Sequence, residues 1–343
     1  MQQKKILVTG GTGYIGSHTV VELLQAGHEV TIADNLSNSE ASVVDRIEQI
    51  TGLRPGFVKV DLAHQNEAHQ FYKTQQRVDA VIHFAASKAV GESVEQPLMY
   101  YHNNLNSLIH LLEYTKEYNI GSLVFSSSCT VYGQPSTLPV TEETARREAE
   151  SPYGNTKRIG EDILRDFIRA NRHLNGIALR YFNPIGAHPS ALIGELPRGV
   201  PGNLLPFVTQ TAAGIRKELQ IFGSDYNTPD GTAIRDYIDV VDLAKAHMVA
   251  IQRLLERKNQ SGFEIFNLGT GKGVSVLEMV KTFEEVTQQK VNYRITDRRP
   301  GDIEQIWADT SLANEILGWK AERALEETLL AAWNWEKRLR KIS

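Results

Sequence analysis

Short apolar runs alternate with stretches of helical periodicity through the first half of the chain. Each run is rich in β-branched residues and is bounded by turn-forming residues, which is typical of strands. These runs lie at Lys5–Thr9, Glu29–Ala33, Phe57–Val60, Ala80–Phe84, Leu123–Ser127 and Ile177–Tyr181. Strands that alternate with helices predict βαβ units, whose right-handed crossovers place helices on both faces of a parallel sheet. The pattern therefore predicts an α/β fold with a doubly wound parallel sheet.

The pattern of apolar residues changes at about Pro184, where prolines and glycines interrupt the periodicity until a helical pattern resumes at Leu204. Further along, the pattern predicts a strand at Gly262–Leu268, a helix from Val274, a strand near Val291 and a final helix rich in tryptophan. We expect residues 1–183 to form one domain, which also receives the 235–250 segment, and residues 184–343 to form a second, smaller α/β domain.

Composition excludes several classes of protein. The net charge of −4 gives no basic footprint, so we expect no nucleic-acid partner. The apolar runs are too short to span a membrane, and an early glycine-rich turn interrupts any apolar core of an export signal. The single cysteine, Cys129, excludes an intramolecular disulfide, and the histidines show no ligand spacing with it. We expect a cytoplasmic protein without a metal, in which the charged stretch Glu142–Glu150 is an exposed loop.

A glycine-rich turn follows the first predicted strand. Gly10 permits a tight turn, Gly13 lets the backbone approach a pyrophosphate, and Gly16 lets the helix pack closely on the strand. Three glycines alone could be a structural turn, but Asp34 ends the second strand at the distance where an acid binds the adenosine ribose. This order predicts a dinucleotide site of the Rossmann type and favours NAD over NADP. Asp61 is a candidate partner of the adenine, or simply a turn former.

A second set of residues carries proton chemistry. Tyr153 and Lys157 lie four residues apart at the start of a predicted helix and therefore share one face. An ammonium beside a phenol favours the phenolate, which would make Tyr153 a general base. Alone, the pair could be an ordinary surface pair. Ser128, however, lies at the C-terminal end of the strand Leu123–Ser127, at the edge where open α/β sheets bind ligands. It could simply cap the following turn, but with the other two residues it completes a Ser/Tyr/Lys set.

Several stretches together carry a family resemblance. They are GGTGYIGSHT at 10–19, Asp34-Asn35, VIHFAASKAVGESV at 81–94, FSSSCTVYG at 125–133, SPYGNTK at 151–157, RYFNPIGAHPS at 180–190 and RDYIDVVDLA at 235–244. Over nearly its whole length the chain resembles the extended short-chain dehydrogenase/reductase superfamily and, within it, the UDP-glucose 4-epimerases. The resemblance implies NAD-dependent inversion of carbon 4, which interconverts UDP-glucose and UDP-galactose through a 4-keto intermediate in galactose metabolism.

The resemblance also implies a role for each matching residue. Tyr153 would take the proton of the 4-hydroxyl, Lys157 would hold the ribose and tune the tyrosine, and Ser128 would hydrogen-bond or shuttle the proton. NAD contacts are expected at Gly10, Gly13, Tyr14, Ile15, Gly16, Asp34, Asn35, Asp61, Leu62, Phe84, Ala85, Lys88, Asn103, Ser126, Tyr153, Lys157 and Tyr181. Residues 184–343 are expected to form the UDP-sugar-binding domain. Contacts to the UDP-sugar, from both domains, are expected at Lys88, Ser128, Tyr153, Phe182, Asn183, Asn203, Leu204, Phe222, Arg235, Arg299, Asp302 and Ile306.

Individually, several of these residues have an ordinary alternative. Lys88 could be a solvated charge, Asn103 a cap and the arginines surface charges. Arginine forks nevertheless suit phosphates, an aromatic ring suits uracil, and a carboxylate suits ribose hydroxyls. Ile306 matches a position beside the substituent on carbon 2, where a tyrosine restricts some relatives and small residues admit N-acetylated sugars. Isoleucine is smaller than tyrosine but stiff, so it could be such a gate or a buried aliphatic residue.

Three departures from the family pattern leave the Ser/Tyr/Lys set intact: Cys129 replaces a usual alanine, Gly202 an asparagine and Asp239 a histidine. The helical stretches Asn103–Glu117 and Tyr153–Ala170 resemble those that pair across a two-fold axis, so we expect a homodimer.

Three other functions compete with epimerisation. A nucleotide-sugar 4,6-dehydratase needs an acid/base pair after the serine, where this chain has Cys129 and Thr130. A decarboxylase of a UDP-uronic acid would need a pocket for the sugar carboxylate, which one sequence does not exclude. A non-catalytic NAD-sensing protein would commonly lose the tyrosine or lysine.

Overall fold

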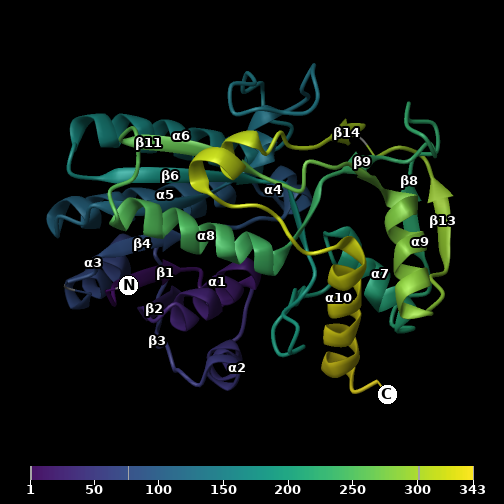
Figure 1. Ribbon diagram of the computed structural model, residues 1–343, viewed down its shortest axis with the longest axis horizontal. Helices are drawn as coiled ribbons and strands as arrows, with labels where there is room; N and C mark the ends of the chain where they lie inside the picture. Colours follow the sequence, from purple (N-terminus) through teal and green to yellow (C-terminus); the bar gives the residue numbers. More distant parts are fainter. Residues whose placement is uncertain (1, 76, 300–301, 343) are drawn as a thin grey trace.

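The computed structural model describes residues 2–75, 77–299 and 302–342. A parallel sheet flanked by helices lies beside a smaller part built from later segments (Figure 1). The sheet has seven strands in the order β11-β6-β5-β4-β1-β2-β3, and every neighbouring pair is parallel. Their bounds are β1 Lys5–Thr9, β2 Glu29–Asp34, β3 Gly56–Lys59, β4 Ala80–His83, β5 Ser122–Ser128, β6 Asn175–Tyr181 and β11 Phe263–Leu268. The predicted α/β fold is confirmed.

Helices cover both faces of this sheet because successive strand residues point to opposite sides. Ile6 and Val8 of β1 belong to one core, whereas Leu7 belongs to the other. The first core lies under α1 Tyr14–Gln25, α2 Ser42–Thr51 and α8 Val240–Leu255. The second lies under α3 Gln65–Thr74, α5 Pro97–Glu117 and α6 Pro152–Ala170. The near-continuous apolar strands of the sequence therefore result from burial on both faces.

The strand order reverses at β1, which lies between β2 and β4. In open α/β sheets, such a reversal leaves a crevice at the carboxyl ends of the strands, where ligands bind. The predicted glycine turn, the end of β2 and the end of β5 all lie at this edge of the sheet. Short segments continue from the same edge, namely α4 Val90–Glu95 and the 3-10 helix Cys129–Tyr132.

In the described residues, the smaller part contains short strands and three helices packed on a core of its own. The strand pairs are β7 Asn183–Ile185 with β10 Tyr237–Asp239, and β8 Leu219–Phe222 with β13 Tyr293–Thr296; a further sheet joins β12 Val274–Ser275, β9 Ile234–Arg235 and β14 Gln305–Ile306. The helices are α7 Leu204–Ala212, α9 Val276–Thr287 and α10 Leu325–Arg340, and a π-helical turn covers Ala313–Leu317. Trp333 of α10 packs edge to face on Phe283 of α9, with ring centres 6.0 Å apart.

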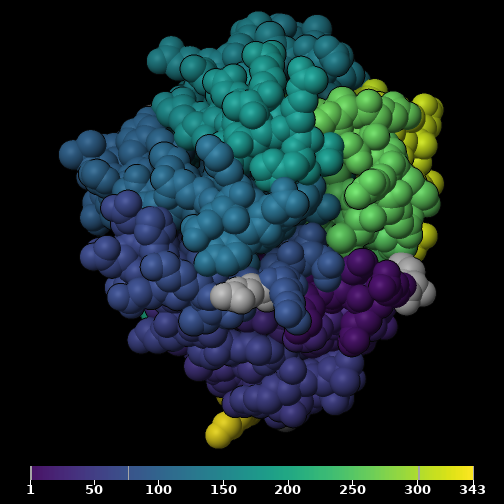
Figure 2. Space-filling model, turned by 90° about the vertical axis from the view of Figure 1, so that its left-hand side faces the viewer, coloured from purple at the N-terminus to yellow at the C-terminus, as the bar shows by residue number. Residues whose placement is uncertain are grey.

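Segments after residue 183 also contribute to the large sheet. The structure assigns β11 and α8 to this sheet, although the pattern grouped Gly262–Leu268 with the second region. The space-filling view shows the connection from α8 to β11 in green, beside the purple to teal surface of the first part (Figure 2). The division at residues 183 and 184 stays a prediction. In the described part of the chain, no helix is both long and apolar enough to cross a membrane.

The stretch Glu142–Glu150 is a loop, but it is not simply exposed. Glu142 is half-buried and accepts a hydrogen bond from the Asn267 amide at 2.7 Å. Arg146 lies against α6 and pairs with Asp162 at 2.6 Å. The expectation was wrong for these two residues because their charges have partners within the fold.

Candidate active site

The glycine turn has the shape of a cradle for a phosphate. At Gly10, with φ +72°, an added Cβ would lie 2.7 Å from the Ala85 amide nitrogen, and at Gly16 it would overlap the Gly10 carbonyl oxygen. At Gly13 an added Cβ would have one near neighbour among the described atoms, the same oxygen at 3.2 Å. Gly10 and Gly16 are thus required by packing, whereas a Cβ at Gly13 would meet one backbone oxygen closely among the described atoms. Gly13 is the N-cap of α1 and makes no side-chain cap, so the helix amides can receive an anion.

The acid at the end of β2 is buried and held in a fixed orientation. Asp34 accepts hydrogen bonds from the Thr12 amide at 3.1 Å and the Leu36 amide at 2.9 Å, so its carboxylate lies beside the glycine turn. Next to it, the Asn35 side chain donates to Asp61 at 3.1 Å. The structure therefore brings together the three polar residues expected around the adenosine, and Leu62 is buried behind them.

The segment after β4 lies on the other side of β1. Phe84 stacks obliquely on His247 of α8, with ring centres 4.6 Å apart, and the Ala85 amide donates to Thr9 Oγ1. Lys88 lies over the ring of Tyr14, with Nζ 5.7 Å from its centre. Asn103 of α5 donates to Ser87 Oγ at 3.2 Å and so adjoins the same loop. These expected contacts surround one crevice.

The Ser/Tyr/Lys set assembles at the carboxyl end of β5, and all three side chains are buried. Ser151 caps α6 through its hydroxyl, and Pro152 opens the helix, so Tyr153 and Lys157 fall on the first buried turns. Lys157 Nζ donates to the Ser126 carbonyl at 2.7 Å and lies 5.9 Å from the centre of the Tyr153 ring. Tyr153 is hydrogen-bonded to Ser128.

Burial controls the electrostatics of this set. It raises the pKa of Tyr153 well above its usual value, a shift that the hydrogen bond with Ser128 opposes. Burial lowers the pKa of Lys157 to about 7. The expected lowering of the tyrosine pKa by Lys157 is therefore not seen in the chain by itself, because desolvation dominates and the lowering comes from Ser128.

A second cluster joins the two arginines predicted to hold phosphates. Arg235 and Arg299 both pair with Asp302, at 3.4 and 2.9 Å. The guanidinium of Arg299 also lies 5.5 Å from the centre of the Phe222 ring. An aromatic face, two guanidinium groups and a carboxylate thus lie together, which is the donor set expected for a nucleoside diphosphate.

The start of α7 provides a further polar contact. Asn203 is its N-cap and makes no side-chain cap, and Leu204 is its first residue. The Asn203 amide instead donates to Glu195 at 2.6 Å, and Glu195 also pairs with Lys88 at 3.0 Å. Glu195, which the sequence did not single out, thus links a residue expected at the cofactor with one expected at the substrate. Its partners are distant in sequence, so no local pattern indicates it.

The strand end of β6 connects the catalytic set to the arginine cluster. Tyr181 shares a short hydrogen bond with Ser126, and Phe182 packs in one cluster with Ile306. Ile306 is buried and pairs in register with Arg235. Asn183 begins β7 and donates its amide to the Asp236 carbonyl at 2.9 Å.

Cys129 shows that the two clusters border one site. It lies next to Ser128 and packs against the cluster that holds Phe182 and Ile306, and Ile306 pairs in register with Arg235. Burial raises the pKa of this thiol to about 12, so it stays protonated near neutral pH.

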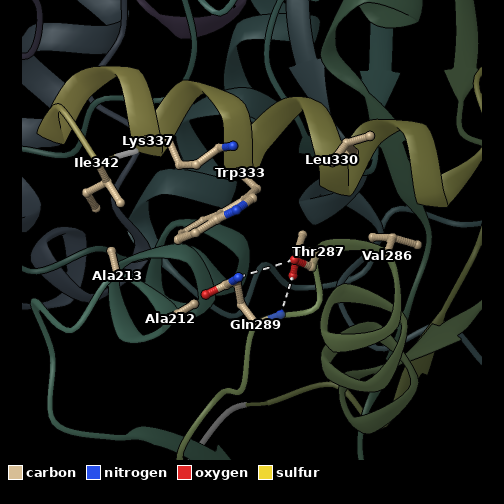
Figure 3. A pocket seen from close by; sticks show the side chains of 9 residues that line it. All are labelled: Ala212, Ala213, Val286, Thr287, Gln289, Leu330, Trp333, Lys337 and Ile342. Atoms are coloured by element: carbon tan, nitrogen blue, oxygen red, sulfur yellow. Dashed lines mark hydrogen bonds between the residues drawn. The ribbon is translucent and has the colours of Figure 1, made fainter.

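A separate hollow of about 340 Å³ lies between α7, α9 and α10 (Figure 3). Trp333 extends from α10 toward Gln289 and the end of α7, with Lys337 and Leu330 on either side of it along the same helix. None of the predicted site residues lines this hollow, so we do not assign it to the reaction. Among the described residues, no group of three or more histidine, cysteine or acidic side chains could hold a metal ion.

Comparison with known proteins gives consistent matches. The model of the NAD dependent epimerase/dehydratase family matches residues 6–269. A UDP-glucose 4-epimerase of Bacillus subtilis (strain 168) is 51% identical over 331 residues, which cover 96% of each chain. A solved UDP-glucose-4-epimerase from Stenotrophomonas maltophila, with bound NAD and formylated UDP-arabinopyranose, has a TM-score of 0.95 and 47% identity over 99% of this chain and 100% of that one.

A second solved structure, of a UDP-glucose 4-epimerase from Bifidobacterium longum in complex with NAD+ and UDP, has a TM-score of 0.93. The two sequences are 45% identical, and the match covers 99% of this chain and 100% of the Bifidobacterium longum chain. Identity at this level over whole chains requires common ancestry as well as a common fold. The chain belongs to the NAD-dependent epimerase/dehydratase family.

Proposed function

We propose that this protein is an NAD-dependent epimerase of UDP-hexoses, which interconverts UDP-glucose and UDP-galactose by inverting carbon 4. The observation that carries the proposal is the buried set of Ser128, Tyr153 and Lys157, which borders a cluster suited to a nucleoside diphosphate. The relatives that match over their whole lengths are named UDP-glucose 4-epimerases. Interconversion of these two sugar nucleotides belongs to galactose metabolism.

The residues at the switch point fit NAD. Gly13 is the N-cap of α1 and has no side chain to cover the helix amides, so a pyrophosphate would lie there, and Lys88 lies over the ring of Tyr14 at the start of the same helix. Asp34 would accept hydrogen bonds from the ribose hydroxyls and would repel a 2′-phosphate. When bound, NAD supplies an acceptor that takes the hydride from carbon 4 and returns it, together with the positive charge that favours the phenolate of Tyr153.

Tyr153 handles the proton of the 4-hydroxyl. Its phenolate takes this proton as the hydroxyl becomes a ketone and returns it when the ketone is reduced on its other face. Ser128 hydrogen-bonds the tyrosine and would bond the same sugar oxygen, and Lys157 holds its ammonium beside the phenol. Because all three are buried, their mutual interactions are stronger than in water.

The arginine cluster would hold the nucleotide of the substrate while the sugar rotates. Arg235 and Arg299 suit the two phosphates, and Asp302 suits the ribose hydroxyls. Binding of the nucleotide would replace the ion pairs between these arginines and Asp302. The ring of Phe222 suits the flat uracil. Asn203 and the uncapped start of α7 suit the second phosphate. Binding by the nucleotide leaves the 4-keto sugar free to present either face.

A dehydratase is disfavoured by the residues after Ser128. Elimination of water would require a carboxylic acid or another strong acid/base group there, but the buried thiol of Cys129 has a pKa of about 12 and a threonine follows.

We also propose that UDP-N-acetylglucosamine is accepted as a second substrate. Ile306 lies beside Arg235 and in one cluster with Phe182, so its side chain would border the sugar. Its volume leaves more room near carbon 2 than a tyrosine would.

A homodimer is the proposed assembly. Val90 and Val94 of α4, and Leu98 and Ile109 of α5, are large apolar residues with exposed side chains. These helices lie on the face that α5 shares with α6. Burying such residues against a second copy would remove apolar area from water.

A direct experiment is incubation of the purified protein with UDP-galactose, followed by separation of the sugar nucleotides. We expect UDP-glucose to form until both are present at equilibrium, without added reductant. Formation of a 4-keto-6-deoxy sugar instead would indicate a dehydratase, and retention of NAD without any turnover would indicate a sensor.

A further inference from the structure

A buried pair of opposite charges lies directly behind the catalytic set. Glu161 of α6 and Arg180 of β6 have side chains that are 0% and 2% exposed. The pair is bidentate, because Arg180 Nε donates to Glu161 Oε1 at 2.9 Å and Nη2 donates to Oε2 at 2.7 Å. Neither residue is among those expected to contact NAD or the substrate. The reaction as described above does not use this pair.

The position of the pair connects it to each catalytic residue. Glu161 lies one turn after Lys157 and two turns after Tyr153 on the buried face of α6. It also accepts a hydrogen bond from Ser127 Oγ at 2.6 Å, and Ser127 is the neighbour of Ser128. Arg180 pairs in register with Ser127.

Side-chain hydrogen bonds connect strands β5 and β6 on both faces of the sheet, near their carboxyl ends. Toward α6, Glu161 holds Ser127 and Arg180, whereas on the opposite face Ser126 is bonded to Tyr181. Arg180 Nη1 reaches further, to the Tyr132 hydroxyl at 2.9 Å and the Glu142 carbonyl at 3.3 Å. The pair thus links α6, β5 and β6 with the 3-10 helix Cys129–Tyr132 and with the loop that contains Glu142.

Stability alone gives no good reason for such a pair. Moving two charges out of water costs about as much as their attraction returns, and apolar residues of similar volume often serve equally well. A bidentate arginine–carboxylate pair differs from an apolar contact in fixing distance and direction. The pair therefore provides alignment of α6 with β5 and β6 more than it provides stability.

We propose that Glu161, Arg180 and Ser127 form a positioning cluster that sets the placement of Tyr153 and Lys157 relative to Ser128 and the reacting carbon. This inference rests on the proposed epimerase function. Catalysis depends steeply on such placement, since a displacement of about 1 Å can cost about 100-fold in rate. Binding of the nucleotide depends on other residues, so the cluster should act on kcat and not on KM.

Single substitutions test the effect on rate. We expect Ser127→Ala and Glu161→Gln to lower kcat for UDP-glucose by about 10-fold to 100-fold, while KM and the NAD content change less than about twofold. Ser127→Ala is the gentler variant, because it removes one hydrogen bond and leaves both charges paired.

A double substitution separates positioning from stability. Glu161→Met with Arg180→Met removes both buried charges, and Arg146, which also lies 3.5 Å from Glu161, keeps its partner Asp162 at 2.6 Å. The double variant should therefore recover most of the thermal stability that Glu161→Gln loses. We expect its kcat to stay as low as in the single variants. If the cluster only stabilised the fold, kcat would recover together with the melting temperature.

The chain offers a matched control. Arg253 of α8 and Glu264 of β11 form another bidentate pair, at 2.8 and 3.0 Å, with side chains 10% and 9% exposed. Glu264→Gln should lower the melting temperature but leave kcat unchanged, since no catalytic residue lies on these two elements.

The outcomes distinguish a failure of the proposed function from a failure of the positioning cluster. Wild-type protein that does not epimerise UDP-glucose would overturn the proposed function itself. Active wild-type protein together with wild-type kcat in Ser127→Ala, or recovered kcat in the double methionine variant, would overturn the positioning cluster alone.

Discussion

Tyr153 has a buried phenol, and its hydroxyl is the group that reacts in the proposed mechanism. Replacing it with phenylalanine removes that hydroxyl and leaves the ring in place, so the fold and the bound NAD should persist. We predict that turnover of UDP-galactose falls by about 100-fold or more, as expected for loss of a general base. Tyr101→Phe is the control, because Tyr101 carries a half-buried hydroxyl bonded to Asn155 outside the catalytic set. Near-wild-type turnover in Tyr153→Phe would remove the tyrosine from the mechanism.

Lys157 gives the stability of the NAD-free protein a defined pH dependence. Burial lowers its pKa from 10.5 to about 7. Between these values the unfolded chain binds a proton that the folded chain does not, so this lysine makes the fold more stable as pH rises. Lys157→Met lacks this contribution. We predict that the excess stability of the variant over wild type, from denaturant titrations, shrinks from pH 7 to pH 9 by up to about 1.4 kcal/mol per pH unit. A constant difference would show that the lysine is charged in the fold.

Ile306 is the residue that we expect to set the choice of sugar. Ile306→Tyr fills the space proposed for an acetamido group, so it should suppress turnover of UDP-N-acetylglucosamine and largely spare UDP-glucose. Comparison of kcat/KM for the two substrates measures this selectivity. An equal loss of both activities, or a wild type that never accepts the acetylated sugar, would mean that Ile306 is an ordinary core residue.

At the scale of elements, the sequence predicts the helices and strands whose bounds are set by residues close by in the chain. The strand at Lys5–Thr9 and the helix that carries Tyr153 follow from periodicity, a cap and a proline. The strand expected near Val291 begins at Tyr293, because its partner β8, about 70 residues earlier, decides where pairing starts. The inward positions of Glu142 and Arg146 also depend on distant partners.

The same distinction holds within the site. Asp34 and the glycine turn belong to one local motif and were predictable, whereas the link from Lys88 through Glu195 to Asn203 joins separate parts of the chain. Arg180 and Glu161 did leave a signal, since a charged residue interrupts an apolar strand and another follows Lys157 on a buried helix face. The signal indicates burial of charge but not the partner.

Helices α4 and α5 yield a prediction about assembly. Leu98, at the start of α5, is 72% exposed in the single chain. We predict that the wild type sediments as a dimer at micromolar concentration and that Leu98→Glu shifts it toward monomer, because a charge would be buried in the interface. Leu53→Glu, at another exposed leucine beyond the end of α2, should remain dimeric. A monomeric wild type would contradict the proposed interface.

For the whole molecule, we propose that two parts cooperate on one reaction. The large sheet supplies the crevice at its switch point, and the smaller part supplies the arginines and the start of α7. Lys88 and Glu195 join the two across the crevice. Because a 4-epimerase needs the sugar to turn while its nucleotide stays bound, this division suits a reaction in which the hydride never leaves the protein.

The most direct test of that claim follows the hydrogen on carbon 4. Protein purified without added cofactor is given UDP-galactose deuterated at carbon 4, and the UDP-glucose formed is examined by mass spectrometry and NMR. Our account predicts that the deuterium is retained at carbon 4 of the product, with no free NADH accumulating during turnover. Loss of the deuterium to solvent, or steady release of NADH, would contradict it.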